Sequence, residues 1–285
     1  MRLKWHGYFG LAIIIAAEIL LFARQPFVST WFTPIAWTGY ILFADALILR
    51  KRGSSLFHDR LAEVPFMAFL SVLCWLVFEV YNLRLANWAY VGVPGEPFQR
   101  TLGYGWSFAT IFPGIFQTAE LLDAYGVFSR TMRRPFKWGP AQLALSFIAG
   151  LALVTIPLAL PRTIGAYLFA AVWVGYIFLL EPVNYRLGAP SIFRELEEGR
   201  PARMWQLLTA GLLCGLLWEF WNYWAAGKWI YIFPMFQNLK LFEMPAPGFL
   251  GFPPFALECF AMYSFCMWAL QADRWGILNT RRAAN

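Results

Sequence analysis

Two short strings with the same polar residues could carry chemistry in this chain. They read Phe78-Glu79-Val80-Tyr81-Asn82 and Trp218-Glu219-Phe220-Trp221-Asn222. Residues three apart on a helix share one face. Each string therefore predicts a carboxyl and an amide that point to one place between aromatic rings. The alternative is a hydrogen bond at a helix end that holds the following loop, and the sequence favours neither.

A proline string followed by a glutamate comes after each of these pairs. Phe112-Pro113-Gly114 precedes Glu120, and Phe252-Pro253-Pro254 precedes Glu258. Proline alone indicates only a break in a first helical turn. Interrupted helices at matching places of two repeats are typical of membrane binding sites. The repeated glutamates therefore favour a site, and we expect one cavity to hold the candidate acid–base residues Glu79, Glu120, Glu219 and Glu258.

Aromatic side chains surround these positions and supply the candidate ligand contacts. Two long loops, near 84–105 and 226–247, contain Trp88, Tyr90, Tyr104, Trp229 and Tyr231. Most such aromatics form a belt at the membrane interface, and a loop that folds over a cavity is the less common alternative. As ligand-binding residues we select Asn82, Asn222, Tyr81, Trp218, Trp221, Trp88 and Trp229.

The composition shows which elements must position these residues. Of the 285 residues, 60% are hydrophobic and only 14% are charged, whereas a soluble domain carries about a quarter charged residues. The chain is therefore expected to be an all-α, polytopic membrane protein. A span needs roughly 20 apolar residues, and we expect eight spans near 8–24, 31–49, 64–83, 106–128, 141–160, 163–186, 204–225 and 248–271.

The basic residues predict an orientation in the membrane. Seventeen of the 23 Lys and Arg residues lie in the termini and in alternate connections, from Arg2 and Lys4 to Arg274, Arg281 and Arg282. Such segments face the cytoplasm. We therefore expect a multi-pass protein of the plasma (inner) membrane with both termini cytoplasmic. The net charge of +7 then needs no nucleic acid partner.

An internal repeat divides the chain into residues 1–137 and 138–285. Trp37, Gly39 and Tyr40 recur with the same spacing as Trp173, Gly175 and Tyr176. Further along, Cys74, Glu79 and Asn82 recur as Cys214, Glu219 and Asn222, and Phe112-Pro113 recurs as Phe252-Pro253 at the same offset. Two tandem four-helix units insert in the same direction, so a pseudo-two-fold axis along the membrane normal is expected.

Four further acidic residues lie within the expected spans. Asp45 and Glu181 precede Arg50 and Arg186 by five residues, which favours a structural role, whereas the sequence assigns no partner to Glu18 or Asp123. No lysine lies in any expected span. We therefore expect all eight acidic residues in the expected spans to lack buried cationic partners, and several of them to be protonated or hydrogen-bonded.

Several kinds of site are excluded. The sequence contains no Walker A loop, dinucleotide fingerprint or nucleophile elbow. With two histidines and no Asp-rich diphosphate motif, it indicates no metal site. An enzyme here would use carboxylates without a cofactor. The four cysteines lie in apolar stretches and behave as small apolar side chains.

The second half resembles a known family, the membrane lycopene cyclase domain of the heterodimeric bacterial type. The resemblance rests on Trp218-Glu219-Phe220-Trp221-Asn222, Gly227-Lys228-Trp229-Ile230-Tyr231, Pro254 and Glu258, within residues 216–258 and less closely 76–120. It implies that Glu219 and Glu258 act as acid–base carboxyls, with Glu79 and Glu120 as counterparts. It also implies a carotenoid or isoprenoid substrate whose carbocations are shielded by aromatic rings.

Three functions remain open at this point. The first is binding, and cyclase or isomerase chemistry, on an apolar isoprenoid-like lipid. The second is proton-coupled transport, with the carboxylates as proton sites. The third is a structural subunit of a membrane complex, with other subunits or a second copy of the chain as partners.

Overall fold

The computed structural model of the protein describes residues 2–270, most of which are helical. Five of its helices are long and apolar enough to cross a membrane, which is consistent with a membrane protein. They are α1, α3, α5, α8 and the segment Ala246–Ala269. Residue 271 of the eighth expected span and the basic residues Arg274, Arg281 and Arg282 lie outside the described residues.

The elements of the two halves follow a similar order. The first half forms α1 (Trp5–Phe22), α2 (Pro26–Thr30), α3 (Phe32–Arg52), α4 (Leu56–Asp59), α5 (Glu63–Leu85), β1 (Trp88–Val91), α6 (Pro97–Ala109) and α7 (Ile111–Ala124). The second half forms α8 (Pro140–Ala159), α9 (Arg162–Gly165), α10 (Phe169–Leu187), α11 (Ile192–Glu197), α12 (Ala202–Trp224), β2 (Lys228–Tyr231), β3 (Lys240–Leu241), β4 (Met244–Pro245), the 3-10 helix η1 (Ala246–Gly251) and α13 (Phe252–Ala269).

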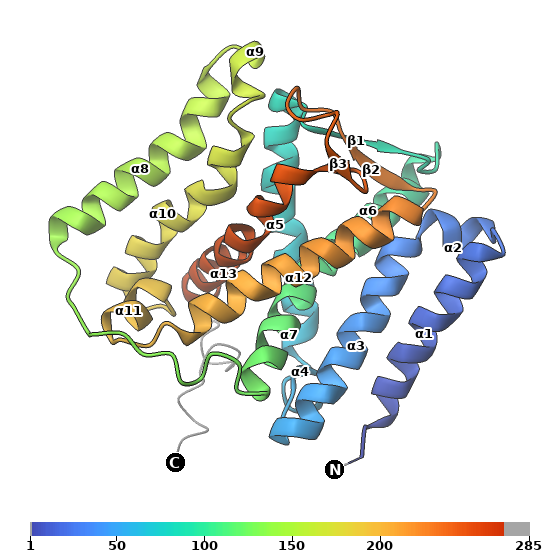
Figure 1. The fold of residues 1–285 in the computed structure, drawn as a ribbon, viewed down its shortest axis with the longest axis horizontal. Helices are drawn as coiled ribbons and strands as arrows, with labels where there is room; N and C mark the ends of the chain where they lie inside the picture. Colours follow the sequence, from blue (N-terminus) through green and yellow to red (C-terminus); the bar gives the residue numbers. More distant parts are fainter. Residues whose placement is uncertain (1, 271–285) are drawn as a thin grey trace.

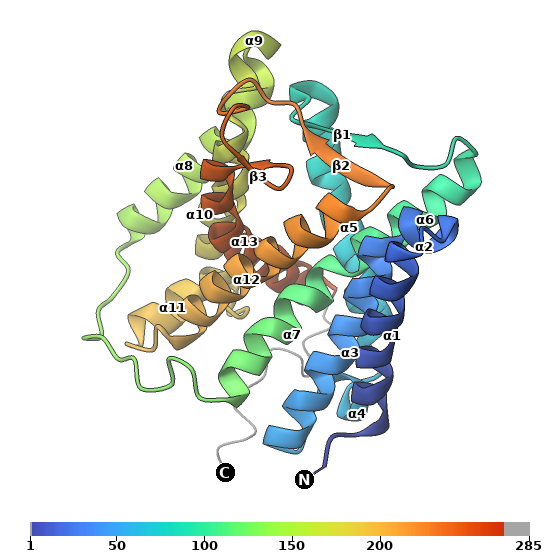
Figure 2. The same ribbon diagram turned by 45° about the vertical axis from the view of Figure 1, so that its right-hand side comes forward.

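The long helices run alternately up and down the molecule. In Figures 1 and 2, α1, α5, α8 and α12 rise from the end where the chain starts, and α3, α7, α10 and α13 return to it. The short connections α4 and α11 lie at that lower end, whereas β1, β2 and α9 lie at the upper end. Residues that follow α5 and α12 are therefore brought to the same end.

The prolines explain where the helices depart from the expected spans. The fourth expected span, 106–128, is two helices, because α6 ends at Ala109 and α7 begins at Ile111. Pro113 and Pro253 sit in the first turns of α7 and α13, where the missing N–H costs nothing. The structure therefore agrees with the interpretation of these prolines as breaks in a first helical turn.

Glycines allow close helix packing in both halves. A Cβ on Gly10 of α1 would lie 2.4 Å from the carbonyl oxygen of Gly39 on α3. A Cβ on Gly150 of α8 would lie 2.2 Å from the backbone nitrogen of Leu179 on α10. Small residues at such crossings let the backbones of membrane helices approach closely. The helix pairs α1–α3 and α8–α10 thus pack through the same device.

The two halves meet in an antiparallel ribbon. Strand β1 pairs with β2 so that Trp88 lies opposite Tyr231, Ala89 opposite Ile230 and Tyr90 opposite Trp229. The ribbon crosses the upper end of the molecule (Figure 2). Its side chains alternate between its two faces, so Trp88, Tyr90, Trp229 and Tyr231 share the face that points into the molecule.

Buried carboxyls bind the turns at the lower end. The Asp45 carboxylate accepts from Ser55 Oγ at 2.8 Å and from the Phe57 backbone N–H at 3.1 Å. Glu181 accepts from Ser191 Oγ at 2.8 Å and from the Phe193 N–H at 3.1 Å. Both carboxyls therefore hold the chain after a helix, which is the structural role that the sequence favoured.

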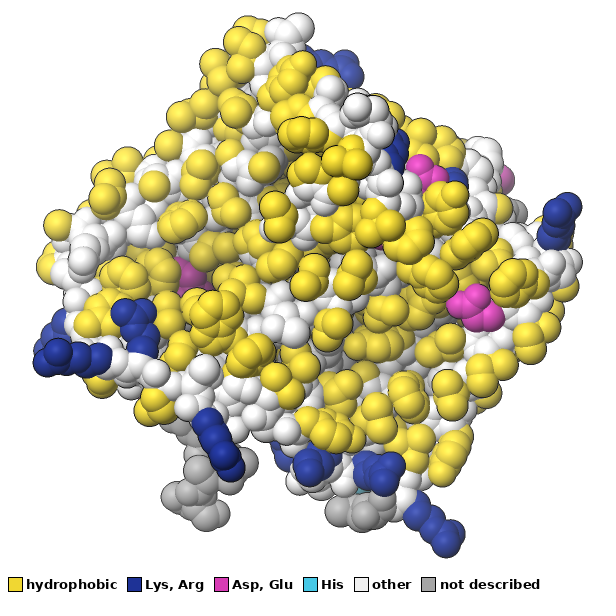
Figure 3. All heavy atoms as spheres, viewed as in Figure 1, with side chains coloured by type: hydrophobic (Ala, Val, Ile, Leu, Met, Phe, Trp, Pro, Cys, Tyr) yellow, Lys and Arg dark blue, Asp and Glu magenta, His cyan; other side chains and the backbone are white. Residues whose placement is uncertain are grey.

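The surface separates an apolar middle from a basic end. In Figure 3, hydrophobic side chains cover the middle of the face, and most of its Lys and Arg residues lie along the lower edge. Large apolar side chains such as Leu83, Ile148 and Phe22 are exposed. Such a surface is unfavourable in water and suits a lipid environment.

Candidate functional site

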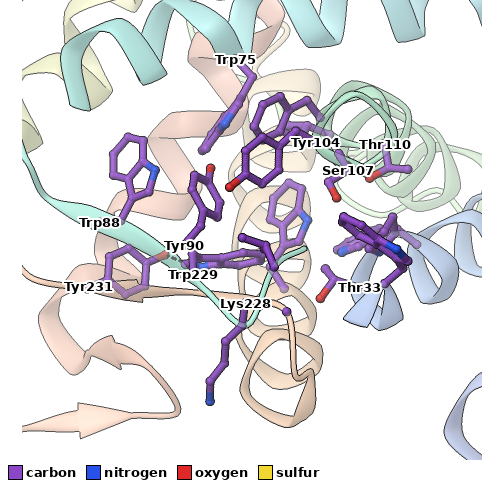
Figure 4. A pocket seen from close by; sticks show the side chains of 18 of the residues that line it. Thr33, Trp75, Trp88, Tyr90, Tyr104, Ser107, Thr110, Lys228, Trp229 and Tyr231 are labelled. Carbon is purple, nitrogen blue, oxygen red and sulfur yellow. Dashed lines mark hydrogen bonds between the residues drawn. The ribbon is translucent and has the colours of Figure 1, made fainter. Parts of the chain in front are cut away.

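An aromatic cavity lies beneath the ribbon, between elements of both halves. Its volume is about 110 Å³. Its aromatic lining comes from α2, α3, α5, α6, α10, α12, α13 and the ribbon, and comprises Trp31, Trp37, Trp75, Trp88, Tyr90, Tyr104, Phe108, Trp173, Trp218, Trp229, Tyr231, Phe252 and Phe255. Figure 4 shows Trp88 and Tyr231 at one side of the cavity and Thr33, Ser107 and Thr110 at the other. The cavity therefore has an aromatic side and a side that carries hydroxyls.

Glu79 lies directly behind the first part of this lining. It is half-buried on α5 and its Oε1 accepts from Trp75 Nε1 at 2.8 Å and from Trp88 Nε1 at 3.3 Å. The hydroxyl of Tyr90 also donates to it. All three donors line the cavity, whereas Glu79 itself does not. The carboxylate thus fixes the orientation of aromatic rings in the cavity wall.

Glu219 does the same for the second strand of the ribbon. It is fully buried on α12, and its Oε1 accepts from Tyr231 Oη at 2.8 Å and from Trp229 Nε1 at 3.3 Å. Trp229 and Tyr231 both line the cavity. The glutamates of the two Glu-x-x-Asn strings therefore both hold aromatic rings that line one cavity.

The two tyrosines of the ribbon remain donors. Burial, and then the neighbouring Glu79 carboxylate, raise the pKa of Tyr90 well above its ordinary value. Burial and the Glu219 carboxylate do the same to the pKa of Tyr231. Both phenols therefore stay protonated near neutral pH and hold their hydrogen bonds to the carboxylates.

The two asparagines hold the loops that follow their helices. Asn82 Nδ2 donates to the Trp88 carbonyl at 2.9 Å, and its Oδ1 accepts from the N–H of Asn87 and of Trp88. Asn222 Nδ2 donates to the Trp229 carbonyl at 2.8 Å, and its Oδ1 accepts from the Trp229 N–H. For the asparagines the geometry agrees with the loop-holding alternative, and neither side chain lines the cavity.

The other two glutamates lie elsewhere. Glu258 is fully buried on α13 and accepts from the backbone N–H of Tyr176 at 2.9 Å. Glu120 on α7 lies toward the basic end, where Arg60 binds both of its carboxylate oxygens at 2.8 and 2.9 Å. The expected meeting of four glutamates in one cavity is therefore not observed. Their catalytic role stays a prediction.

Glu120 and Glu258 also do not occupy matching places. Phe112-Pro113 and Phe252-Pro253 lie in the first turns of their helices, and aligning the helices at these prolines places Glu258 opposite Thr118. Thr118 bonds the hydroxyl of Tyr40 at 2.7 Å, and Glu258 bonds the backbone N–H of the matching residue, Tyr176. Two residues turn a helix by about 200°, so Glu120 points to a different side.

Cationic partners reach the carboxyls from the connections between helices. Arg60, which precedes α5, pairs with Glu120, and Arg52 at the end of α3 pairs with Asp123. The expectation that the carboxyls of the spans lack buried cationic partners was therefore wrong for Glu120, whereas the Arg52–Asp123 pair is exposed. It considered only residues within the expected spans, whereas a long arginine side chain can reach back along a helix end. Glu18 interacts with the side chain of Trp221.

The remaining predicted ligand residues divide between wall and support. Trp88, Trp218 and Trp229 line the cavity. Trp221 packs against Trp37 with ring centroids 5.2 Å apart, and Tyr81 Oη donates to the Val154 carbonyl at 2.8 Å. Trp221 therefore supports the wall from behind, whereas Tyr81 joins α5 to α8 outside the cavity lining.

Sequence reasoning missed much of the lining. Trp31, Thr33, Trp37, Trp75, Trp173, Phe252 and Phe255 line the cavity but were not selected. The recurrence of Trp37 as Trp173 was a usable signal, because a repeated tryptophan on matching helices points to the interface between the halves. Of the aromatics in the long loops only Trp88 and Trp229 were selected, and the structure also places Tyr90, Tyr104 and Tyr231 in the cavity wall.

Comparison with family models, curated proteins and solved structures finds no match to this chain.

Proposed function

We propose that the protein is a multi-pass membrane protein that binds an apolar, isoprenoid-like ligand in the aromatic cavity. The observation that carries the proposal is the cavity wall, built by tryptophan and tyrosine rings from both halves and held by Glu79 and Glu219 from behind. Pockets lined mainly by aromatic and apolar groups, with a few placed polar groups, are typical ligand sites. With a cavity volume of about 110 Å³, a carotenoid or another long polyene would place only one end between these walls.

Eight spans in two tandem units form part of the proposal. The matched hydrogen bonds of Asn82 and Asn222, and of Glu79 and Glu219, support the repeat. So does the ribbon, because pairing Trp88 with Tyr231 and Tyr90 with Trp229 is what a two-fold axis through Ala89 and Ile230 generates. Such an axis runs along the membrane normal when the units insert in the same direction.

The basic lower end supports a cytoplasmic location of both termini in the inner membrane. Single cysteines at positions 51 and 240, introduced by Lys51→Cys and Lys240→Cys in a Cys266→Ser background, test this orientation. An impermeant thiol reagent is expected to label position 240 in intact cells and position 51 only after the membrane is opened. Labelling of both positions in intact cells contradicts the topology.

Acid–base chemistry on a bound polyene, which the family resemblance implies, has a defined route. The carboxyls of Glu79 and Glu219 are separated from the cavity by the rings they bind. This route requires a protonated carboxyl, which would donate to the hydroxyl of Tyr90 or Tyr231 while that hydroxyl passes its own proton to the ligand. The same pair would take up the proton that the carbocation later releases. A cyclase or isomerase function therefore predicts that Tyr90→Phe and Tyr231→Phe lose turnover while binding persists.

Binding is tested directly with the purified protein in lipid nanodiscs. Lycopene and squalene serve as probes, and mass analysis shows bound and converted lipid. Tyr104→Leu, which removes a half-buried ring from the wall, is expected to weaken binding several-fold. Tyr167→Leu is the matched control, because Tyr167 is exposed and remote from the cavity. Absence of any bound lipid, added or co-purified, contradicts the proposal.

Proton-coupled transport is a second candidate, supported by buried carboxyls outside the cavity wall. Glu258 is fully buried and its Oε2 has no hydrogen-bond partner among the described residues, and the same holds for both carboxylate oxygens of Glu63. Such groups in a membrane often relay protons. Transport is supported if liposomes with the native protein take up protons and liposomes with Glu258→Gln do not. Equal uptake by empty liposomes and by liposomes with the protein excludes it.

A further inference from the structure

Two polar side chains in the cavity wall lack hydrogen-bond partners. Thr33 and Trp37 lie four residues apart on α3, which places them on one face of the helix. Both line the cavity, with exposed fractions of 6% and 0%. Thr33 Oγ1 and Trp37 Nε1 find no hydrogen-bond partner among residues 2–270. One wall of the cavity therefore presents two unsatisfied polar atoms side by side on the helix.

Among the fully buried side-chain polar atoms of the lining in the described residues, these two alone lack a hydrogen-bond partner. Trp75, Trp88 and Trp229 donate to glutamates, as described above. Ser107 Oγ donates to the Gly103 carbonyl at 2.9 Å, and Thr110 Oγ1 to the Ser107 carbonyl at 2.7 Å. More than nine in ten buried polar groups in proteins have a partner. The unsatisfied pair is thus specific to this wall.

The chemistry of the missing partner follows from the two groups. An indole N–H can only donate, and a hydroxyl can donate as well as accept. One oxygen atom with two lone pairs could therefore accept from both. Among the described residues, the only charged side chain in the lining is Lys228, whose Nζ lies 2.6 Å from the Glu243 carboxylate. Because this cation is already paired, the wall suits a neutral oxygen better than an anion.

The shape of the cavity indicates a ring. Its volume of about 110 Å³ is comparable in scale to an engineered apolar cavity of about 150 Å³ that holds benzene. Flat walls line it: Tyr104 and Phe108 are stacked with ring centroids 5.7 Å apart. In Figure 4, Thr33 lies on the side with Ser107 and Thr110, opposite Trp88 and Tyr231. A ring between these sides would turn one edge toward α3.

We propose that the ligand is an oxygenated cyclic isoprenoid, and that a ring carbonyl oxygen accepts hydrogen bonds from Trp37 Nε1 and Thr33 Oγ1. The inference rests on the proposed function, because it names the class of ligand that the aromatic cavity selects. A pure hydrocarbon leaves both donors without partners in a water-free wall, and this costs binding free energy. A ring carbonyl could belong to a quinone or to a terpenoid ketone, and the chemistry of recognition is the same.

Two matched pairs of probes test the oxygen. The first pair is 2,3-dimethyl-1,4-naphthoquinone and 2,3-dimethylnaphthalene. The second is carvone, a terpenoid ketone whose carbonyl lies in the ring, and limonene, which has a CH2 group in its place. Titration calorimetry against nanodiscs with protein, corrected with empty nanodiscs, gives the affinities. We expect the oxygenated member of at least one pair to bind about tenfold more tightly or better. Preference within the first pair assigns a quinone, and preference within the second a terpenoid ketone.

The outcomes separate this inference from the proposed function. Equal affinities within both pairs contradict the proposed ring carbonyl, while the cavity remains a ligand site. No measurable binding of any of the four probes, together with no binding of lycopene or squalene, overturns the cavity function as well.

Variants locate the oxygen. Thr33→Val keeps the shape of the side chain and Trp37→Phe keeps an aromatic ring, and each is expected to lower the preference for the oxygenated probe about three- to tenfold. Trp106→Phe is the matched control, because the Trp106 N–H donates to Thr38 and the residue does not line the cavity. Trp37 packs against Trp218 and Gly114 and its substitution can prevent folding; Thr33→Val then decides. An unchanged preference in Thr33→Val contradicts the assigned position.

Discussion

Glu79 and Glu219 occupy matching places on α5 and α12 and bind matching residues of the ribbon, but their surroundings differ. Each accepts from an indole of the ribbon at 3.3 Å and from a tyrosine hydroxyl two residues later. Glu79 is half-buried and gains a third donor, Trp75 Nε1. Glu219 is fully buried, and its Oε2 has no hydrogen-bond partner among the described residues.

The difference comes from one substitution between the halves. Trp75 stands one helical turn before Glu79 on α5, and the matching place before Glu219 on α12 is taken by Gly215. A Cβ on Gly215 would lie 2.2 Å from the ring of Phe252. The aromatic wall is thus supplied by α5 itself in the first half and by α13 in the second.

This comparison separates the polar anchor from the wall it supports. The same carboxylate and ribbon bonds hold two different sets of rings, so the cavity is asymmetric although its anchors match. Removing the Glu219 carboxylate should lower the free energy of unfolding more than removing the Glu79 carboxylate. Glu219 is wholly removed from solvent, so a donor that loses it as acceptor cannot bond water instead.

Removal of the carboxylates should give the largest effect. Glu219→Leu leaves the buried Tyr231 hydroxyl without an acceptor, whereas Trp229 Nε1 keeps the Tyr231 oxygen at 3.1 Å, so the free energy of unfolding should fall by about 1–3 kcal/mol. Glu79→Leu should cost about half as much, because the half-buried Trp75 and Tyr90 can donate to water instead. Unfolding in mixed detergent and SDS micelles measures both. Glu219→Gln, whose amide oxygen can still accept, is the control, and a larger loss for Glu79→Leu would contradict the comparison.

The glycine that distinguishes the halves should be the next most sensitive position. Gly215→Ala forces a methyl group into the ring of Phe252 and should destabilise the protein by about 1–3 kcal/mol. Gly105→Ala is the matched control, because no atom lies within 4 Å of its added Cβ in α6. There, alanine should be neutral or stabilising. If the two variants have the same stability by SDS titration, the proposed crowding at Gly215 is absent.

The asparagines should have smaller effects that follow the number of bonds. Asn82 makes three hydrogen bonds to the loop, and Asn222 makes two. Asn82→Ala should therefore cost about 1–2 kcal/mol and Asn222→Ala somewhat less. Hydrogen exchange should quicken at β1 in the first variant and at β2 in the second. Unchanged exchange of the ribbon in both variants would show that the loops are held by other contacts.

The sequence predicted the long helices and the matched polar strings. Apolar runs placed α1, α3, α5, α8 and α12 within a few residues of their observed ends, because an apolar run of membrane length has few alternatives to a helix. The strings around Glu79 and Glu219 were recognised because each keeps a carboxyl and an amide at helical spacing. Each expected unit has an even number of spans, so α5 and α12 run in the same direction and bring both strings to the same end of the molecule (Figures 1 and 2).

Other features depended on information that is not local. The pairing of β1 with β2 joins loops from opposite halves of the chain and has no signal within either loop. Glu120 was matched with Glu258 because a glutamate follows each Phe-Pro string, but their distances from the strings differ by two residues, and such a shift changes the face of the helix on which a side chain lies. The Arg60–Glu120 pair required the path of the turn before α5. Side-chain reach and helix rotation thus decided what the sequence pattern left open.

The turns at the basic end extend the comparison to its smallest effect. Asp45 binds Ser55, the Phe57 N–H and His6 Nε2 at 3.1 Å, whereas Glu181 binds only Ser191 and the Phe193 N–H among the described hydrogen bonds. Ser191→Ala should cost about 1 kcal/mol, and Ser55→Ala a few tenths less, because His6 still satisfies Asp45. The double variant His6→Ala/Ser55→Ala removes both side-chain partners of Asp45. It should lower the free energy of unfolding by about as much as Ser191→Ala does. SDS titration gives the stabilities, and hydrogen exchange at α4 and α11 locates the loosened turn. If Ser55→Ala is more costly than Ser191→Ala, the histidine does not compensate, and the two turns differ for another reason.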